Sequence, residues 1–453
     1  MKLRKKNFSE NGKIIIKNVS GAFIIRGISV VLSFFMMPMY IRFFNNQIVL
    51  GLWFTLLSVL SWILTFDLGI GNGLRNHLTE SLALKKIDEA KKYVSSAYVS
   101  IGFLCLVLAV VFFIVFRFIN WNFVLNIGED IVSSESLLFA VVIVFVGIII
   151  HFFLKLISSV LYAIQKSSVN NLLSLITSLL MLLGLFLIPS SSNNDENIII
   201  MAILHALAVI VPLVVTSVYL FCFSTVRIIR PSISCFDLSY AKKVLSLGGV
   251  FFYAQLVYFF IMSTNEYLIT LLTDNSYVVE YRIYNTIFTF GSTLFLLAMT
   301  PVWSVVTKAL AERDFNWINR LYKKLMFFAG LGCLAEFLII PFLQIFINIW
   351  LQSKAITVGL LPAIVFACMG SLMILNSVLS GIANGAGELR TQVIFFSIGA
   401  ALKIPVAMIL SRKIGWSGVV VANAVAMSFY CFVQPFWLKA FLKKKRMLQG
   451  EAS

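Results

Sequence analysis

The chain has 453 residues, of which 60% are hydrophobic and only 12% are charged, and phenylalanine alone occupies 42 positions. This composition excludes an ordinary soluble protein, because a soluble core does not need so much apolar surface. The net charge of +17 would suit a nucleic-acid-binding protein, but the basic residues flank apolar stretches, where anionic lipid headgroups account for them. We therefore expect an all-α integral membrane protein with no nucleic-acid partner.

The apolar stretches have the length of membrane-spanning helices. Such a helix needs about 20 mostly apolar residues, because the hydrocarbon layer holds no water to satisfy backbone groups outside a helix. The sequence contains about twelve stretches of this kind. They are expected at residues 19–41, 50–71, 94–118, 137–164, 169–189, 198–223, 247–272, 283–306, 325–350, 358–383, 392–410 and 416–438. Only residues 165–168 separate the fourth stretch from the fifth, which predicts a tight helical hairpin.

The basic residues define the orientation of these helices. Most of the 36 Lys and Arg residues fall on alternate loops, and such loops stay on the cytoplasmic side of a membrane. Both termini are therefore expected in the cytoplasm. The first stretch follows MKLRKK but is long and lacks a small-residue cleavage site, so we expect an uncleaved helix instead of a secretory signal.

Neither a disulfide framework nor a metal site is expected. Five of the six cysteines fall within the predicted spans, and Cys235 lies in an inner loop. His77, His151 and His205 lie in separate segments without Cys or carboxylate partners at ligand spacing. A Walker-type phosphate loop is also missing from the sequence, so we expect no ATP hydrolysis by this chain and no cofactor.

A pattern in one half of the chain recurs in the other at an offset of 232 residues. Leu78, Glu80, Lys91 and Lys92 recur as Leu310, Glu312, Lys323 and Lys324. The alternative explanation is that any inner loop with an amphipathic helix places basic residues next to the membrane. If the repeat is real, residues 1–232 and 233–453 form two six-helix lobes joined by residues 227–243. Two lobes around a cavity at the membrane midplane are typical of a transporter.

Charged side chains deep within the spans are the strongest functional feature of the sequence. An ionised group at the bilayer centre costs roughly 3 kcal/mol on insertion scales, so it is expected to face a cavity or an opposite charge. His151 and Lys155 are four residues apart and share one face of the fourth span. Lys403 lies deep in the eleventh span and Glu336 deep in the ninth. The alternative for these residues is a buried ion pair that holds helices together.

Three further charged residues lie nearer the ends of spans. Arg26 and Asp67 are close to the cytoplasmic ends of the first and second spans, and Arg282 is at the outer edge of the eighth. At such positions a long side chain can reach the headgroup region, which is the alternative to a functional role.

A resemblance to a known family is carried by DLGIGNGLRN at Asp67–Asn76 and the charged inner loop after it. LGLW at Leu50–Trp53, YRIYN at Tyr281–Asn285 and GIANGAGE at Gly381–Glu388 add to it. With its span number and loop sizes, the chain resembles a Wzx-type polysaccharide flippase over essentially its whole length. Such proteins belong to the multidrug/oligosaccharidyl-lipid/polysaccharide (MOP) exporter superfamily, in which two MATE-like helix bundles alternate access. The glycines at 69, 71 and 73 are explained at least as well by helix termination and packing as by substrate contact.

The resemblance implies a cargo and a site. The cargo would be an undecaprenyl-pyrophosphate-linked oligosaccharide, moved from the cytoplasmic to the outer leaflet of a bacterial inner membrane for O-antigen or another surface polysaccharide. The implied partners are membrane lipids, a polysaccharide polymerase and a chain-length regulator. Cations that would bind the pyrophosphate are Arg26, Lys155, Arg282 and Lys403. Carboxylates that would couple transport to an ion gradient are Asp67, Glu266 and Glu336. Polar groups expected in the cavity are His151, Asn265 and Asn285.

Two other functions stay open at this point. Another exporter of the same superfamily, for a drug or a different lipid-linked precursor, would share the architecture. A membrane polysaccharide polymerase or ligase is the enzymatic alternative, and it would be expected to have a sizeable outer loop with catalytic residues. The longest outer loop, residues 119–136, offers only Glu129, Asp130 and Glu135. We therefore expect a transporter and not an enzyme.

Overall fold

The computed structural model is helical throughout the residues it describes, and these residues contain no strand. They are residues 69–448, without 126, 274–276 and 352–355, together with part of residues 18–56. Parts of the predicted first two spans, and both Arg26 and Asp67, lie outside them. Ten helices within the described residues are long and apolar enough to cross a membrane. The predicted all-α, multi-pass fold class is confirmed.

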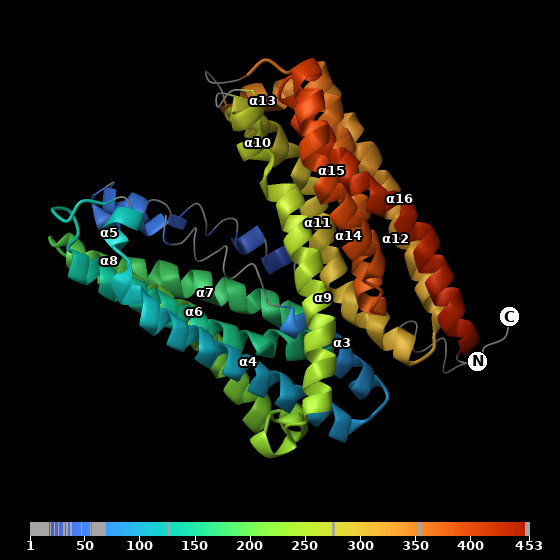
Figure 1. The fold of residues 1–453 in the computed structure, drawn as a ribbon, viewed down its shortest axis with the longest axis horizontal. Helices are drawn as coiled ribbons and strands as arrows, with labels where there is room; N and C mark the ends of the chain where they lie inside the picture. Colours follow the sequence, from blue (N-terminus) through green and yellow to red (C-terminus); the bar gives the residue numbers. More distant parts are fainter. Residues whose placement is uncertain are drawn as a thin grey trace. The chain divides into compact units, whose positions relative to one another are not determined.

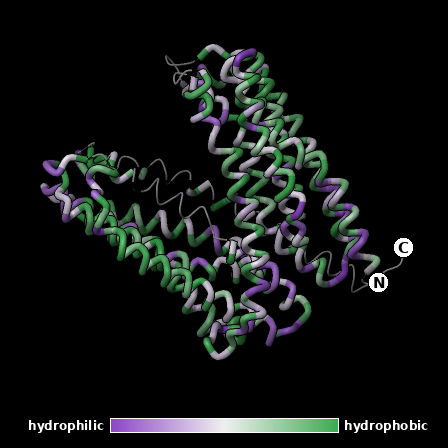
Figure 2. The backbone as a smooth tube through the Cα atoms, in the orientation of Figure 1, coloured by the Kyte–Doolittle hydropathy of each residue, from purple (hydrophilic) through white to green (hydrophobic). Residues whose placement is uncertain are grey.

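The helices are apolar on their outward faces as well as inside, which a soluble protein would not tolerate. On α4 (Ile87–Val115), the exposed side chains include Phe103, Leu106, Val110 and Ile114. These residues follow one another at helical spacing, so they form one continuous apolar face. Figure 2 shows that hydrophobic residues run along the lengths of the helices and that hydrophilic residues concentrate toward helix ends and loops. This distribution matches helices whose sides face lipid.

The chain divides into two compact units, residues 16–249 and 250–453, and the division falls within α9 (Leu238–Ser263). Each unit has a hydrophobic cluster of its own. The sequence-based boundary between residues 232 and 233 refers to the internal repeat and stays a prediction.

The first unit contains the long helices α4, α6 (Ser134–Ala163), α7 (Ser167–Leu187) and α8 (Asn194–Val218), which are labelled in Figure 1. Helix α6 packs against α4, α7 and α8. A π-helical turn at Tyr219–Phe223 and a 3-10 helix at Thr225–Ile229 follow α8. The α-helices of this unit are α3 (Ile70–Ala83), α4, α5 (Trp121–Val124), α6 (Ser134–Ala163), α7 (Ser167–Leu187) and α8 (Asn194–Val218).

The second unit is built mainly on α14, which packs against α11, α12 and α16, while α15 packs against α16. Its helices after α9 are α10 (Asn265–Leu272), α11 (Tyr277–Ala311), α12 (Phe315–Ile339), α13 (Leu343–Leu351), α14 (Leu360–Ala386), α15 (Arg390–Ile414) and α16 (Ser417–Leu448). Two predicted spans are interrupted here. The ninth divides into α12 and α13 at Pro341, which lacks the N–H that a continuous α-helix needs. The seventh divides into α9 and α10, for a reason given below.

The glycines at the start of α3 have the structural role that the sequence indicated. Gly69 adopts φ 69° immediately before the helix, a left-handed conformation that costs glycine little. A Cβ atom at Gly73 would lie 2.3 Å from the carbonyl oxygen of Val244, and one at Gly248 would lie 2.8 Å from that of Gly69. The backbones of α3 and α9 therefore approach so closely that only glycine fits at Gly73 and Gly248.

The segment between α8 and α9 is tied to α4 by hydrogen bonds. The N–H of Asp237 donates to Ser96 Oγ, and that hydroxyl donates back to the carbonyl of Asp237, each at 3.1 Å. The N–H of Ser232 donates to Ser95 Oγ at 3.1 Å. The backbone N–H of Ser239 holds the pKa of the Asp237 carboxyl below its usual value, because it stabilises the ionised form at the start of α9.

Four helix pairs are closed by the same turn. After α3, α6, α11 and α14, one residue is left-handed, at Lys85, Gln165, Arg313 and Gly387. In every case its N–H bonds three residues back and the next N–H bonds five residues back. This is the Schellman motif, which satisfies the last carbonyls of the first helix. The turn at Gln165 confirms the predicted tight hairpin between the fourth and fifth spans.

Three of these left-handed positions carry a side chain where glycine would be unstrained. We expect Gln165→Gly, at φ 62°, to raise the free energy of unfolding by about 0.5–1 kcal/mol, because it removes a clash with Cβ. The thermal unfolding midpoint of the purified protein in detergent measures this. The control is Lys166→Gly, at φ −102°, which has no such strain to relieve and is expected to lower the midpoint or leave it unchanged. An equal rise in both variants would contradict the prediction.

Candidate functional site

Lys403 on α15 is completely buried and lies at the break between α9 and α10. Its ammonium donates hydrogen bonds to the backbone carbonyl of Ile261 and, at 2.8 Å, to Thr264 Oγ1. The carbonyls of the last turn of a helix have no partner within the helix, and a cation at that end is favoured by the helix dipole. Lys403 therefore stabilises the interruption of the seventh span, which coincides with the polar run at residues 263–266.

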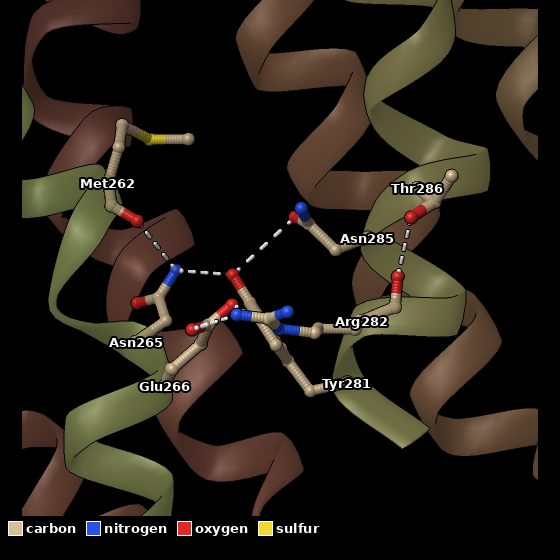
Figure 3. A network of polar contacts seen from close by, with 7 residues as sticks. All are labelled: Met262, Asn265, Glu266, Tyr281, Arg282, Asn285 and Thr286. Carbon is tan, nitrogen blue, oxygen red and sulfur yellow. Dashed lines mark hydrogen bonds and ion pairs between the residues drawn. The ribbon is translucent and has the colours of Figure 1, made fainter. Parts of the chain in front are cut away.

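A chain of amide and hydroxyl groups begins directly after this break (Figure 3). Asn265 is 3% exposed, and its Nδ2 donates to the carbonyl of Met262 at 3.4 Å and to Tyr281 Oη at 3.0 Å. The Tyr281 hydroxyl donates in turn to Asn285 Oδ1 at 3.5 Å. Asn265 Oδ1 is buried without a hydrogen-bond partner among the described residues. The structure thus brings the predicted cavity residues Asn265 and Asn285 together and leaves one acceptor available.

Arg282 and Glu266 form an ion pair beside this chain (Figure 3). The guanidinium Nε and Nη2 donate to the two carboxylate oxygens at 2.9 Å each, which is the bidentate geometry of a strong charge-assisted contact. Both side chains are accessible, at 67% for Arg282 and 43% for Glu266. The sequence analysis predicts substrate binding for Arg282 and ion coupling for Glu266. The structure joins them, and the two separate roles stay predictions.

Glu336 on α12 occupies a niche between α11 and α14. It is 3% exposed, and its Oε2 has no hydrogen-bond partner among the described residues. A Cβ atom at Gly291 would lie 2.5 Å from Oε1, and one at Gly370 would lie 2.9 Å from Oε2. The two glycines therefore create the space that the carboxylate fills.

His151 and Lys155 are one turn apart on α6, in the other unit. His151 lines a small pocket together with His205 of α8, and its buried Nδ1 has no partner among the described residues. The ring of His205 meets that of Trp53 edge to face at 5.6 Å. Lys155 is half-buried. The neighbouring histidines were not paired by sequence reasoning because they lie on different spans.

A second polar network joins α14, α15 and α16 and was not predicted. Gln392 Nε2 donates to Asn384 Oδ1 at 2.7 Å. The Thr391 hydroxyl contacts Glu388 Oε2 at 2.8 Å and also Gln434 Oε1. Asn384 and Glu388 belong to the GIANGAGE segment that helped to identify the family resemblance. The one feature of the sequence that could have indicated this network is the presence of amide side chains near the ends of apolar helices.

These contacts place buried polar groups on several helices of the unit of residues 250–453. One ammonium, one carboxylate and several amides lie inside helices that are apolar enough to span a membrane. In the part of the chain that is described, no three His, Cys, Asp or Glu side chains gather as a metal site would require. Arg26 and Asp67 lie outside the described residues, so their predicted roles are not examined by the structure.

The role of Lys403 at the helix break can be measured as stability. We expect Lys403→Met to lower the free energy of unfolding by about 1–3 kcal/mol, because the carbonyl of Ile261 loses a buried partner. Lys413→Met, at an exposed position of the same helix, is the control and should change it by less than about 0.5 kcal/mol. Equal unfolding midpoints in detergent for Lys403→Met and the unmodified protein would show that the ammonium does not hold the break.

Comparison with known proteins identifies the fold. Models of protein families give no match to this sequence, and neither do curated protein sequences. Solved structures do match. The bent form of the Vibrio cholerae MATE transporter VcmN has a TM-score of 0.74 and is 15% identical, over 98% of this chain and 99% of that one. A multidrug resistance MATE family transporter of the MOP superfamily, in an outward-facing conformation, has a TM-score of 0.76 at 14% identity, over 96% and 97% of the two chains.

A MATE structure in the straight conformation is similar to the same degree, with a TM-score of 0.75 at 15% identity, over 96% of this chain and 97% of that one. At such low identity the likeness shows the fold alone. The chain has the fold of MATE transporters of the MOP superfamily, an architecture of roughly 12 helices, as the sequence predicted.

Proposed function

We propose that this chain flips undecaprenyl-pyrophosphate-linked oligosaccharide repeat units from the cytoplasmic to the outer leaflet of a bacterial inner membrane, by alternating access. The observation that carries the proposal is the set of buried polar groups on membrane-spanning helices, chiefly Lys403, Glu336 and Asn265. Such groups are expensive within a bilayer, which favours a functional reason for them. The fold, which is shared with transporters, supports the same conclusion.

Arg282 is the cation best placed to meet the pyrophosphate. Its guanidinium is exposed and already holds a bidentate acceptor, the carboxylate of Glu266. A pyrophosphate presents the same planar pairs of oxygens with more charge, so it can replace Glu266 in this contact. Loading of cargo would then release Glu266, and departure of cargo would restore the ion pair. Lys155, half-buried on α6, is a second candidate cation.

Lys403 has a different place in this mechanism. Two of its three N–H groups are used by Ile261 and Thr264, so its main effect is to position the start of α10. Asn265 follows directly, and its Oδ1, which has no partner among the described residues, can accept a hydrogen bond from a sugar hydroxyl. The Tyr281 and Asn285 side chains extend this polar surface.

Glu336 is the candidate for ion coupling. Its carboxylate is buried, with an oxygen that has no partner among the described residues, so binding of a proton or a metal cation would neutralise it. The same feature supports a second candidate function, an exporter of the MOP superfamily for another cargo. The negative charge of Glu336 would attract a cationic drug, whereas it would repel a pyrophosphate.

The proposal is tested by deleting the gene and following undecaprenyl-linked repeat units and surface polysaccharide. We expect surface polysaccharide to disappear while intact repeat units accumulate on the cytoplasmic side, because no protein moves them across. Repeat units that reach the outer leaflet but stay unpolymerised would indicate a polymerase instead. Unchanged polysaccharide would favour another exporter.

Complementation of this strain tests Arg282 itself. Arg282→Gln should reduce export roughly tenfold or more at normal protein level, because a charge-assisted contact to the pyrophosphate is lost. Arg117→Gln, which removes an exposed cation from the other unit, is the control and should restore export fully. Full export with Arg282→Gln would rule out Arg282 as a pyrophosphate ligand.

Coupling through Glu336 is tested with purified protein in vesicles that contain a fluorescent polyprenyl-pyrophosphate glycolipid. We expect an imposed proton or sodium gradient to accelerate flipping by the unmodified protein and to have no effect on Glu336→Gln, which cannot bind the cation as a carboxylate does. Glu135→Gln, at an exposed position in the first turn of α6, should respond like the unmodified protein. A gradient response that survives in Glu336→Gln would exclude Glu336 as the coupling group.

A further inference from the structure

A basic groove lies where α8 ends, away from the residues discussed so far. The last turn of α8 widens into the π-helical turn Tyr219–Phe223, and Ser224 then begins the 3-10 helix. The Ser224 hydroxyl donates to the carbonyl of Leu220 at 2.7 Å and accepts the N–H of Val226 at 3.1 Å, which fixes this change of direction. The result is an open groove between the start of α4 and the 3-10 helix.

The charge of this groove is entirely positive. Lys91, Arg227 and Arg230 line it, and none of its lining residues is acidic. Arg227 and Arg230 are exposed, and within the described residues neither forms an ion pair. A concave surface with three cations and no anion is built to attract a negatively charged group.

Apolar side chains accompany these cations. Phe223 is 77% exposed and Ile228 is 59% exposed, and both line the groove. A soluble anion such as phosphate gains nothing from an exposed phenylalanine. A phospholipid does, because its glycerol and acyl segments lie next to its charged headgroup, as apolar and basic groups do here.

A second groove with similar lining occurs in the other unit. It lies between the start of α12 and the end of α16. Its lining includes Phe315, Tyr322, Lys439 and Lys443 and no acidic residue. In chain order, α4 and α12 are the third and ninth predicted spans, and α8 and α16 are the sixth and twelfth. The same combination of aromatic and basic residues thus occurs once in each unit, beside the third and the ninth predicted spans.

We propose that each groove binds the headgroup of an anionic phospholipid from the leaflet on the side of the chain that is rich in Lys and Arg. Basic pockets between membrane helices on that side are suited to such headgroups. In the first groove, Arg227 and Arg230 donate charge-assisted hydrogen bonds to the phosphate, and Phe223 contacts the apolar part of the lipid. In the second, Lys439 and Lys443 supply the charge. This assignment does not depend on the proposed cargo.

Native mass spectrometry of the delipidated protein, titrated with phosphatidylglycerol, counts the sites. We expect two tightly bound lipids per chain. Arg227→Gln with Arg230→Gln should leave one, Lys439→Gln with Lys443→Gln should also leave one, and the four changes together should leave none. Each lost charge is expected to weaken binding roughly fivefold at its own groove. Phosphatidylcholine, which has no net charge, should not occupy these sites.

Three controls separate this proposal from its alternatives. Arg412→Gln with Lys413→Gln removes two positive charges from the last turn of α15, which lines neither groove. This variant should keep both lipids. Arg227→Lys with Arg230→Lys keeps the charge and should retain most of the binding. Inorganic phosphate at millimolar concentration should not displace the lipid. The proposal is overturned if the control pair weakens binding as much as the groove variants, if the groove variants still bind two lipids, or if inorganic phosphate competes.

Discussion

The absence of water inside a bilayer is the constraint on which the rest of this structure depends. Every backbone N–H and C=O that leaves a helix there must find a partner within the protein. The four Schellman turns meet this demand at the ends of helices, because their two hydrogen bonds satisfy the last carbonyls. At the break between α9 and α10 a side chain meets it, since the ammonium of Lys403 takes the carbonyl of Ile261.

The same constraint explains how much could be predicted. Apolar length places the described spans, and the brevity of residues 165–168 predicts the hairpin at Gln165, because both follow from what a bilayer requires of local sequence. Gly73 could be recognised as a packing residue for a similar reason. The existence of deep charges at Lys403 and Glu336 was also visible. Most of the helices can therefore be predicted from the local composition of the sequence.

The partners of those charges are not local. Lys403 meets a carbonyl from a helix that lies many residues earlier in the chain, and the polar run at residues 263–266 does not show which helix supplies the partner of that carbonyl. Arg282 and Glu266 are joined by the packing of α10 on α11, which converts two separately predicted groups into one ion pair. An apolar pattern indicates that a residue is buried in a membrane but not which helix lies beside it. Only the tertiary structure distinguishes a cation that holds the backbone in position, such as Lys403, from one that a ligand can reach, such as Arg282.

The niche of Glu336 shows that a site can be specified by atoms that are missing. Gly291 and Gly370 have no functional group, yet a Cβ atom on either one would lie within 3 Å of a carboxylate oxygen of Glu336, too close for both to keep their places. The chemistry at that point is consequently determined by three positions, of which only one has any chemistry of its own. A survey of functional residues by side-chain type would pass over two of the three. For this site, natural variation from glycine to alanine would be as informative as the loss of the acid itself.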